Sequence, residues 1–319
     1  MLQVSCGTGN GQLTSLTDAS VKFSRSRQHW ARLSNPIATA IIVDNEAVDT
    51  PELPDHRSGY SGVASLVHQK QKRSLFVPGI AGLNFEHIHD GTTAGLVEKF
   101  EPRKFPMELR IINQTTVELY QPPTGNWKLE SCGRYELLKD GTLEYRFECI
   151  PRAVDFRNDF IGLFWASYIE QPEDNSIFFR GRKIGRSDPA RWIRGVSPRH
   201  GVSSTHRPAG AATPRVDSDF PLTLVNHPSQ FEVTEPWYFG VCRNMAVVQM
   251  FRPQDQIWIA QSPSGGGQGN PAWDFQWFIR KPKVGQSYGF VMRMAYFPYQ
   301  GRKQLIQQTE VHRAFLKNN

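Results

Sequence analysis

The chain contains 319 residues, of which 39% are hydrophobic, 12% are aromatic and 21% are charged, and its formal net charge is +7. This composition is typical of a globular protein with a sizeable core, and it excludes a collagen, a coiled coil and a wholly disordered chain. The sequence contains no apolar run of about 18 residues, so we expect no membrane-spanning helix.

The N-terminal segment, residues 1–35, is rich in Ser, Thr and Gly. It has no early positive charge and no apolar block of the length found in secretory signals. We therefore expect these residues to be disordered or poorly ordered, and we expect the protein to be cytoplasmic.

Strand-like segments follow one another from residue 36 onward, beginning with a β-branched run at 37–44. They recur roughly every ten residues and are separated by Gly, Pro, Asn and Asp, a spacing that is typical of antiparallel sheets. The most specific turn signal is Asp140-Gly141, which lies between two alternating runs and predicts a β-hairpin.

Residues 182–219 are poor in aliphatic side chains and rich in Arg, Pro, Gly and Ser, which predicts a long loop. The strand pattern resumes at 222–298, and the apolar spacing of residues 304–319 predicts a helix at the C-terminus. The sequence therefore predicts an all-β protein in which residues 36–319 form a single antiparallel β-sandwich domain with a short C-terminal helix.

Two compositional features bear on partners and metals. Much of the basic excess lies in residues 22–32 and 180–199, but no helix-turn-helix, RNA-recognition or zinc-finger pattern is present, so no specific nucleic-acid partner is expected. The widely spaced cysteines contain no C-x-x-C pair, and free buried thiols are a better interpretation than a disulfide or a zinc ribbon; they are Cys6, Cys132, Cys149 and Cys242.

The first candidate for a functional site is the sequence EHIHD at residues 86–90. Because side chains alternate along a strand, His87 and His89 are expected to project from one face together with Phe85. The two imidazoles could bind a metal with a third ligand such as His200, or they could contact a sugar hydroxyl. They could equally be structural histidines, and the glutamate that follows such a pair in cupins is absent here.

The second candidate is Glu235, which is followed by Pro236, Trp237 and Tyr238. Aromatic rings stack on the apolar face of a pyranose, while a carboxylate accepts protons from sugar hydroxyls or acts as a general base. These residues are therefore candidates for a carbohydrate site. The alternative is a glutamate at a sheet edge whose aromatic neighbours belong to the core.

Other residues could complete such a site. His200 lies in a loop between glycine and cations, where it could act as a general acid or be merely solvated. Asp274 lies on a predicted strand, on the face opposite to three aromatic side chains, and is a candidate for the lining of a cleft. The predicted ligand-binding residues also include Trp127, His89 and Arg180.

The segments TEPWYFG (234–240) and KPKVGQSYGFVMRMAYF (281–297) resemble the closing part of galactose-mutarotase-like β-supersandwich domains. The resemblance implies the fold of the aldose 1-epimerases, in which a glutamate is the base, a histidine is the acid and no metal is needed. Carried onto this chain, it makes Glu235 the base and His200 or His87 the acid. The family's N-H-x-Y-F-N motif is absent. The segment GLNFEHIHDG (82–91) also resembles sequences of uncharacterised bacterial proteins.

Three functional hypotheses follow. The first, which we prefer, is a carbohydrate-active enzyme of the aldose-epimerase type, in which Glu235 and a histidine transfer protons while Trp237, Tyr238 and Trp127 hold the sugar ring. It requires a carbohydrate or small polar ligand, and no cofactor, metal or membrane. The second is a non-catalytic carbohydrate-binding protein on the same fold. The third is a metal-dependent enzyme centred on the H-x-H pair.

Overall fold

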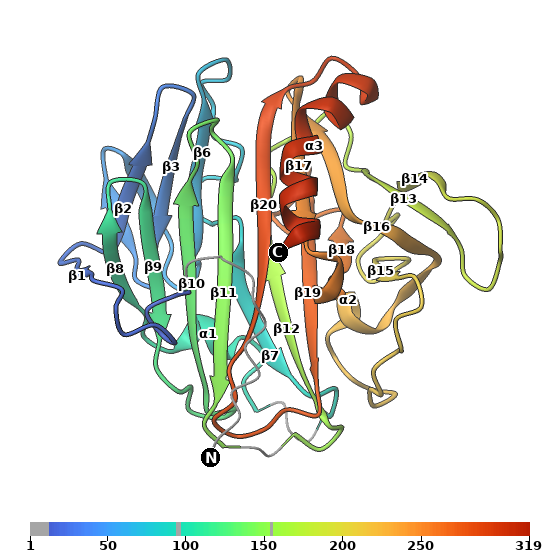
Figure 1. The fold of residues 1–319 in the computed structure, drawn as a ribbon, viewed down its shortest axis with the longest axis horizontal. Coiled ribbons are helices and arrows are strands. Elements are labelled where there is room, and N and C mark those ends of the chain that lie inside the picture. Colours follow the sequence, from blue (N-terminus) through green and yellow to red (C-terminus); the bar gives the residue numbers. More distant parts are fainter. Residues whose placement is uncertain (1–12, 94–96, 154–155) are drawn as a thin grey trace.

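The computed structural model describes residues 13–93, 97–153 and 156–319, which fold mainly into antiparallel β-strands (Figure 1). In this described part, fifteen strands form one long sheet, and its neighbouring strands pair antiparallel except for one parallel pair. The sheet curves until its two halves face each other, and a smaller sheet extends the second layer. The predicted all-β sandwich is therefore confirmed.

The first half of the long sheet contains eight strands in hydrogen-bonded order, which are β1 (Ser24–Arg25), β8 (Glu108–Asn113), β9 (Thr116–Gln121), β10 (Leu129–Leu137), β11 (Leu143–Pro151), β20 (Tyr288–Pro298), β17 (Met245–Phe251) and β16 (Pro228–Cys242). The second half continues from β16 with β15 (Thr205–Pro208), β18 (Trp258–Ser262), β19 (Ala272–Arg280), β12 (Phe160–Ala166) and β7 (Asn84–His89). A hairpin that projects from the molecule pairs with β16 and consists of β13 (Ile177–Lys183) and β14 (Arg191–Gly195). The strand β7 forms one edge of the sheet, and the site described below is built on it.

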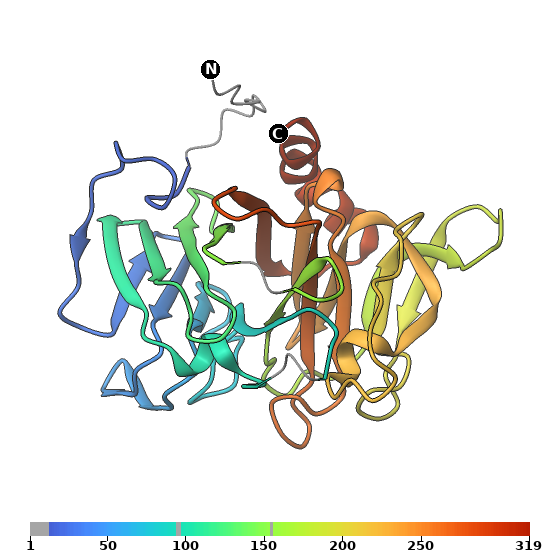
Figure 2. The same ribbon diagram turned by 90° about the horizontal axis from the view of Figure 1, so that it is seen from below.

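The smaller sheet consists of β2 (Trp30–Ser34), β3 (Ala38–Val43) and β6 (Gly62–His68), and it packs against β8–β10 as Figure 2 shows from below. A short hairpin of β4 (Val48–Thr50) and β5 (Leu53–His56) lies between β3 and β6 in the chain. The helical segments are short except for the last; they are α1 (Glu101–Lys104), α2 (Thr223–Asn226), the 3₁₀ turn η1 (Pro253–Asp255) and α3 (Arg302–Asn318).

The two layers are joined by an aromatic core centred on Trp165 of β12. Its ring stacks on Phe85 and Phe275, with centroid separations of 4.9 and 5.2 Å, and meets Phe147 and Phe290 edge-on at 4.9 and 5.0 Å. Burying each side chain of this size contributes about 1.5–3 kcal/mol. Because strands from both halves supply these rings, the core fixes the position of β7 against the opposite layer.

Two local predictions are confirmed. The strands β10 and β11 form the hairpin predicted from Asp140-Gly141, where Gly141 adopts a φ of +84° that favours glycine. The C-terminal helix α3 begins at Arg302 and packs over β17 and β20. Its buried side chains, Leu305, Thr309, His312 and Leu316, recur every three or four residues and so form one face of the helix.

The N-terminal segment differs from its prediction in residues 13–35, while residues 1–12 lie outside the described residues. Thr14 is fully buried, and its backbone N–H and hydroxyl both donate to the carboxylate of Glu148 at 3.0 and 2.5 Å. The hydroxyl and backbone N–H of Ser15 donate to Glu118. Thr14 and Ser15, whose polar character suggested disorder, thus provide hydrogen-bond donors to two buried carboxylates on the sheet.

The segment 182–219 also differs from the predicted loop, because it contains β14, β15 and the end of β13. Backbone pairing with β16 and β18 orders it despite its lack of aliphatic side chains. An ion pair between Arg182 and Glu232 at 2.7 Å links β13 to β16 in the same region.

Three of the four cysteines lie in the described residues, and they are free and buried as predicted: Cys132, Cys149 and Cys242. Cys6 lies outside the described residues. Burial raises the pKa of the Cys242 thiol to about 11, so this group is uncharged at neutral pH. No helix in the described segments combines the length and apolar character needed to cross a bilayer.

Candidate active site beside strand β7

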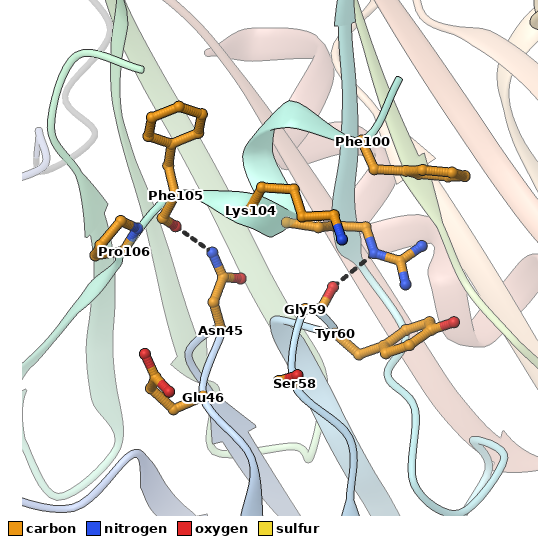
Figure 3. A pocket seen from close by; sticks show the side chains of 10 residues that line it. Asn45, Glu46, Ser58, Gly59, Tyr60, Phe100, Lys104, Phe105 and Pro106 are labelled. Atoms are coloured by element: carbon orange, nitrogen blue, oxygen red, sulfur yellow. Dashed lines mark hydrogen bonds between the residues drawn. The ribbon is translucent and has the colours of Figure 1, made fainter. Parts of the chain in front are cut away.

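Two pockets meet beside β7. The larger one, which we call the outer pocket, has a volume of about 550 Å³ and is lined by Asn45, Glu46, Ser58, Gly59, Tyr60, Phe100, Arg103, Lys104, Phe105 and Pro106 (Figure 3). The smaller one, the histidine pocket, has a volume of about 120 Å³, and its lining includes Glu86, His87, Lys99, Phe100, Phe164, His200 and residues 221–225. Phe100 lines both pockets. Arg103 of the outer pocket places Nη1 3.8 Å from Oε2 of Glu86, so the two pockets form one site.

A β-bulge in β7 creates the central feature of this site. Trp165 of β12 pairs with Phe85, but the preceding Phe164 pairs with His87, so Glu86 is an extra residue in the ladder. A bulge re-aims the side chains around it. Phe85 therefore faces the aromatic core, while Glu86 and His87 both face the histidine pocket.

The carboxylate of Glu86 is an acceptor surrounded by donors. Its Oε1 lies 3.0 Å from Nε2 of His87, and its Oε2 accepts a hydrogen bond of 2.5 Å from the Tyr168 hydroxyl. Burial opposes ionisation of this group, but the charges of His87 and Arg103 and the hydrogen bonds outweigh it and lower the pKa of Glu86. The result is an ionised carboxylate, 11% exposed, in the pocket wall.

His87 faces acceptors with both ring nitrogens. Nδ1 lies 2.5 Å from the backbone carbonyl oxygen of Lys99, which can only accept, and Nε2 faces the carboxylate of Glu86. Both ring nitrogens are therefore engaged within the protein. In this arrangement His87 holds the charge of Glu86 in place and attaches the segment that follows residue 97 to β7.

Arg103 is held between two aromatic rings. Its guanidinium carbon lies 3.9 Å from the ring centre of Tyr60 and 4.8 Å from that of Phe100, which are cation–π distances. Its Nε donates to the carbonyl oxygen of Gly59 at 2.7 Å (Figure 3). Because Nε binds Gly59, the donors of Arg103 that remain for Glu86 or a ligand are its two Nη groups.

The segment that carries Phe100 and Arg103 is fixed by buried amides. Asn45 Nδ2 donates to the carbonyl oxygens of Pro102 and Phe105 at 2.8 and 2.6 Å. Gln121 Nε2 donates to the same two oxygens at 2.8 and 3.0 Å. A helix of four residues cannot stabilise itself, so these side chains determine where α1 lies.

The structure brings together some of the predicted site residues and separates others. His87 and His200, the two candidates for the acid, line the same pocket. Glu235 does not line either pocket. It lies on β16 with 42% of its side chain exposed, where Trp237 Nε1 donates to its Oε2 at 2.9 Å and Arg180 Nε lies 3.5 Å from its Oε1. The carboxylate beside the histidines is therefore Glu86, and the expected pairing with Glu235 is not found.

The predicted aromatic platform of Trp237 and Tyr238 is not available to a ligand. Both rings are buried, Trp237 in the cluster beneath α3 and Tyr238 in the main core. The Tyr238 hydroxyl donates to the backbone oxygen of Asp274 at 3.2 Å. Because helix α3 covers one face of the sheet here and the opposite layer covers the other, neither ring can stack on a sugar.

Of three other predicted ligand-binding residues, Trp127 and Asp274 lie in the interior, and Arg180 is partly exposed beside Glu235. Trp127 is buried and stacks on Phe156 with a centroid separation of 5.0 Å, and its backbone N–H donates to Glu101. Asp274 is fully buried, accepts from the backbone N–H of Ser167 at 2.9 Å, and has a pKa raised well above its ordinary value by burial. Arg180, besides facing Glu235, donates to the carbonyl oxygen of Ala190. The burial of Trp127 and Asp274 corrects their predicted roles.

His89 shares a face of β7 with His87, as predicted, but it lies in an apolar environment. Its ring is fully buried and contacts the rings of Phe160 and Phe220, with centroid separations of 5.9 and 5.0 Å. Burial lowers the pKa of His89 to about 3, so the ring is neutral at ordinary pH. Within the described ranges, no group of three or more His, Cys, Asp or Glu side chains is arranged to hold a metal ion. The metal hypothesis therefore has no candidate site in these residues.

Four residues of the site were not predicted from the sequence, and these are Glu86, Tyr60, Arg103 and Tyr168. Glu86 had a detectable signal, because the segment NFEHIHD places polar residues on both faces of an otherwise apolar strand, and this pattern is compatible with a bulge. The others had none, since they come from three separate segments that only tertiary packing brings together.

Comparisons with known proteins identify relatives of the fold only. No protein-family model matches the chain, and no curated protein is detectably similar to it. Among solved structures, a galactose mutarotase-like protein from Lactobacillus casei ATCC 334 is 8% identical, with 84% of this chain and 99% of that chain covered and a TM-score of 0.47. The Slr1438 protein from Synechocystis sp. PCC 6803 is 12% identical, with 88% and 99% covered and a TM-score of 0.48.

Heparan sulfate lyase HepC from Pedobacter heparinus, in a mutant form, is 8% identical, with 92% of this chain but 38% of that chain covered and a TM-score of 0.45. Galactose-mutarotase-like proteins are thus among the solved structures that this chain resembles, as its C-terminal segments predicted. At these identities, the function has to be inferred from the site itself.

Proposed function

We propose that the protein is a carbohydrate-active enzyme whose active site consists of the outer pocket and the histidine pocket, with Glu86 as its proton acceptor. The observation that carries this proposal is an ionised and largely buried carboxylate in the wall of a pocket. A charged group in such a position has to be held by partners, and here His87, Arg103 and Tyr168 provide them.

The outer pocket suits a saccharide in size and chemistry. Its volume of about 550 Å³ falls within the range of small-molecule sites. Phe100, Tyr60 and Phe105 are partly exposed in its lining and supply aromatic surface that C–H groups of a sugar can contact. Figure 3 shows Lys104 extending over the pocket toward Tyr60, while Glu46 lies at the other end, so hydrogen-bonding groups flank the rings.

The chemistry that this arrangement favours is proton transfer between a carboxylate and an imidazole. In a reaction of the epimerase type, Glu86 takes the proton of the anomeric hydroxyl, the bond between the anomeric carbon and the ring oxygen breaks, and His200 gives a proton to that oxygen. Ring closure on the other face reverses both transfers. Each well-placed acid or base contributes about 10²–10⁴-fold. The pairing is that of the first hypothesis, with Glu86 in place of Glu235.

The test is to measure anomer exchange by NMR on a panel of aldoses and acidic sugars with the native protein, Glu86→Gln and Glu235→Gln. We expect Glu86→Gln to lose about 10²-fold or more of any turnover found and to keep the native unfolding temperature within a few degrees. Asp174→Asn, which alters an exposed ion pair with Arg194, is the matched control. Full turnover in Glu86→Gln, or loss only in Glu235→Gln, would place the site elsewhere.

A specific observation favours non-catalytic carbohydrate binding as the second candidate. Both oxygens of Glu86 and both nitrogens of His87 already have partners within the protein. If a saccharide binds in the outer pocket but no bound saccharide is converted, and if Glu86→Gln binds it as tightly as the native protein, the binding function is the correct one.

A further inference from the structure

Cationic side chains surround Tyr60 and Phe100, two of the three aromatic residues that line the outer pocket. The guanidinium carbon of Arg57 lies 5.2 Å from the ring centre of Tyr60, and Lys99 Nζ lies 5.7 Å from that of Phe100. Arg103 lies between the two rings. Lys104 adds a fourth cation to the pocket lining. The rings and the cations come from only two short segments, residues 57–60 and 99–104.

The acidic groups nearby do not balance these charges. Glu46 is the acidic residue of the outer-pocket lining. Glu98 lies close by and accepts a hydrogen bond from the backbone N–H of Phe100 at 2.9 Å. Glu86 is already balanced by His87 and approached by Arg103. Glu101 of the same segment is buried and accepts hydrogen bonds from the backbone N–H groups of Asn126 and Trp127. Within the lining of the outer pocket, Arg103 and Lys104 stand against the one acid Glu46, so this lining has an excess of positive charge.

The exposed cations of the two segments also lack ion-pair partners within the described residues. No carboxylate there lies within ion-pair distance of the cationic groups of Arg57, Lys99 or Lys104, whereas most arginines on the neighbouring strands β8–β11 are paired, for example Arg110 with Glu108 and Arg146 with Glu144. Side-chain cations that stack on aromatic rings and have no acidic partner are available to an anionic ligand.

We infer that the saccharide bound in the outer pocket is acidic and carries a carboxylate or sulfate group that Arg103 and Lys104 contact. This inference rests on the proposed function and adds the class of ligand. A guanidinium presents planar, fixed donors to a carboxylate or a sulfate, and Arg103 is already immobilised by two rings and by Gly59. The neutral part of the sugar then covers Phe100 and Tyr60.

The test compares saccharides of the same length that differ in their charged group. Calorimetric titrations of the full chain use trigalacturonate, its fully methyl-esterified form, which is neutral, and a sulfated galacto-oligosaccharide of the same length. We expect at least one acidic probe to bind 10-fold or more tightly than the neutral ester at low salt, with the difference shrinking as salt increases. The tighter acidic probe identifies the recognised group.

Two variants assign the effect to the pocket. Lys104→Gln alters an exposed side chain of the pocket lining and should weaken binding of the acidic probe at least threefold, and by a larger factor than it weakens binding of the neutral ester. Lys303→Gln removes one positive charge from α3, away from the pocket, and should leave the affinities for the acidic probe and the neutral ester unchanged. Arg103→Gln should have a larger effect, but it also changes a partner of Glu86. Equal binding of acidic and neutral probes would overturn the inference and leave the proposed function standing, whereas binding of no saccharide would overturn both.

Discussion

Glu86 and His87 are neighbours in the chain whose side chains also contact each other, with 3.0 Å between Oε1 and Nε2. Consecutive residues of a regular strand point to opposite faces of the sheet, so this contact depends on the bulge in β7. The bulge places a charged acceptor and its counter-charge together on the side of the strand that faces the pockets.

The first prediction concerns the pH dependence of activity. His87 lowers the pKa of Glu86, so His87→Gln should raise it. Because the base must be ionised to act, the acidic limb of the profile of kcat/KM against pH should move to higher pH in this variant, while the rate at the plateau falls less than in Glu86→Gln. The same shift should appear in a ¹³C-NMR titration of the Glu86 carboxyl carbon. An acidic limb that stays in place would show that Glu86 is not the titrating base.

The second prediction concerns the contact between Gly162 and His89. A Cβ atom on Gly162 would lie 2.3 Å from Cε1 of His89, far inside van der Waals contact. Gly162→Ala should therefore lower the free energy of unfolding by about 1–3 kcal/mol or more, measured by urea denaturation. The double variant Gly162→Ala/His89→Ala should be less destabilised than the sum of the two single variants, because the clash is removed. Additive effects would contradict the predicted contact.

The third prediction concerns stability at acidic pH. Burial lowers the pKa of both His89 and His206 to about 3, whereas the ordinary value is 6.5. Between these values the unfolded state binds more protons than the folded state, so stability falls as the pH decreases from about 6.5 toward 3. Each histidine should contribute up to about 1.4 kcal/mol per pH unit in this window.

His89→Leu provides the control for this effect, because it keeps an apolar side chain among Phe160 and Phe220 and removes the titrating group. The difference in unfolding free energy between pH 7 and pH 5 should be smaller in this variant than in the native protein by about 1–2 kcal/mol. An identical pH dependence in the two proteins would mean that His89 does not titrate on unfolding.

The fourth prediction concerns the N-terminal segment. Thr14→Val keeps the shape of a fully buried side chain but removes the hydroxyl that donates to Glu148. A hydrogen bond to a charged group contributes about 1.5–3 kcal/mol, so the midpoint of denaturant unfolding should decrease accordingly. Thr39→Val, at an exposed hydroxyl pair with Ser34, should change stability by less than about 0.5 kcal/mol. Equal stability of both variants would contradict the role of the Glu148 contact.

The hairpin and the C-terminal helix could be predicted, because each is specified by local sequence signals. Asp140-Gly141 favours one tight turn, and the spacing of Leu305, His312 and Leu316 defines one helical face, so each element depends on residues close in the chain. The order around Thr14 and Ser15 could not be predicted, because these residues bind buried carboxylates more than 100 residues away.

The site was harder to predict for the same reason. The alternation rule correctly placed His87 and His89 on one face but gave the wrong face for Phe85, because a bulge is determined by pairing with β12. The burial of Trp237 depends on the position of α3, which lies about 70 residues further along the chain. Sequence patterns indicate which side chains are suited to a ligand, but packing decides which of them can reach it.

The buried amides of Asn45 and Gln121 have a consequence for how a ligand would be received. Their hydrogen bonds to the backbone of Pro102 and Phe105 fix the segment that carries Phe100 and Arg103. The conformational entropy of this segment is therefore lost during folding, before any ligand binds. Binding should then proceed as the docking of a ligand onto a rigid surface, and structures with and without ligand should superimpose closely at residues 99–105.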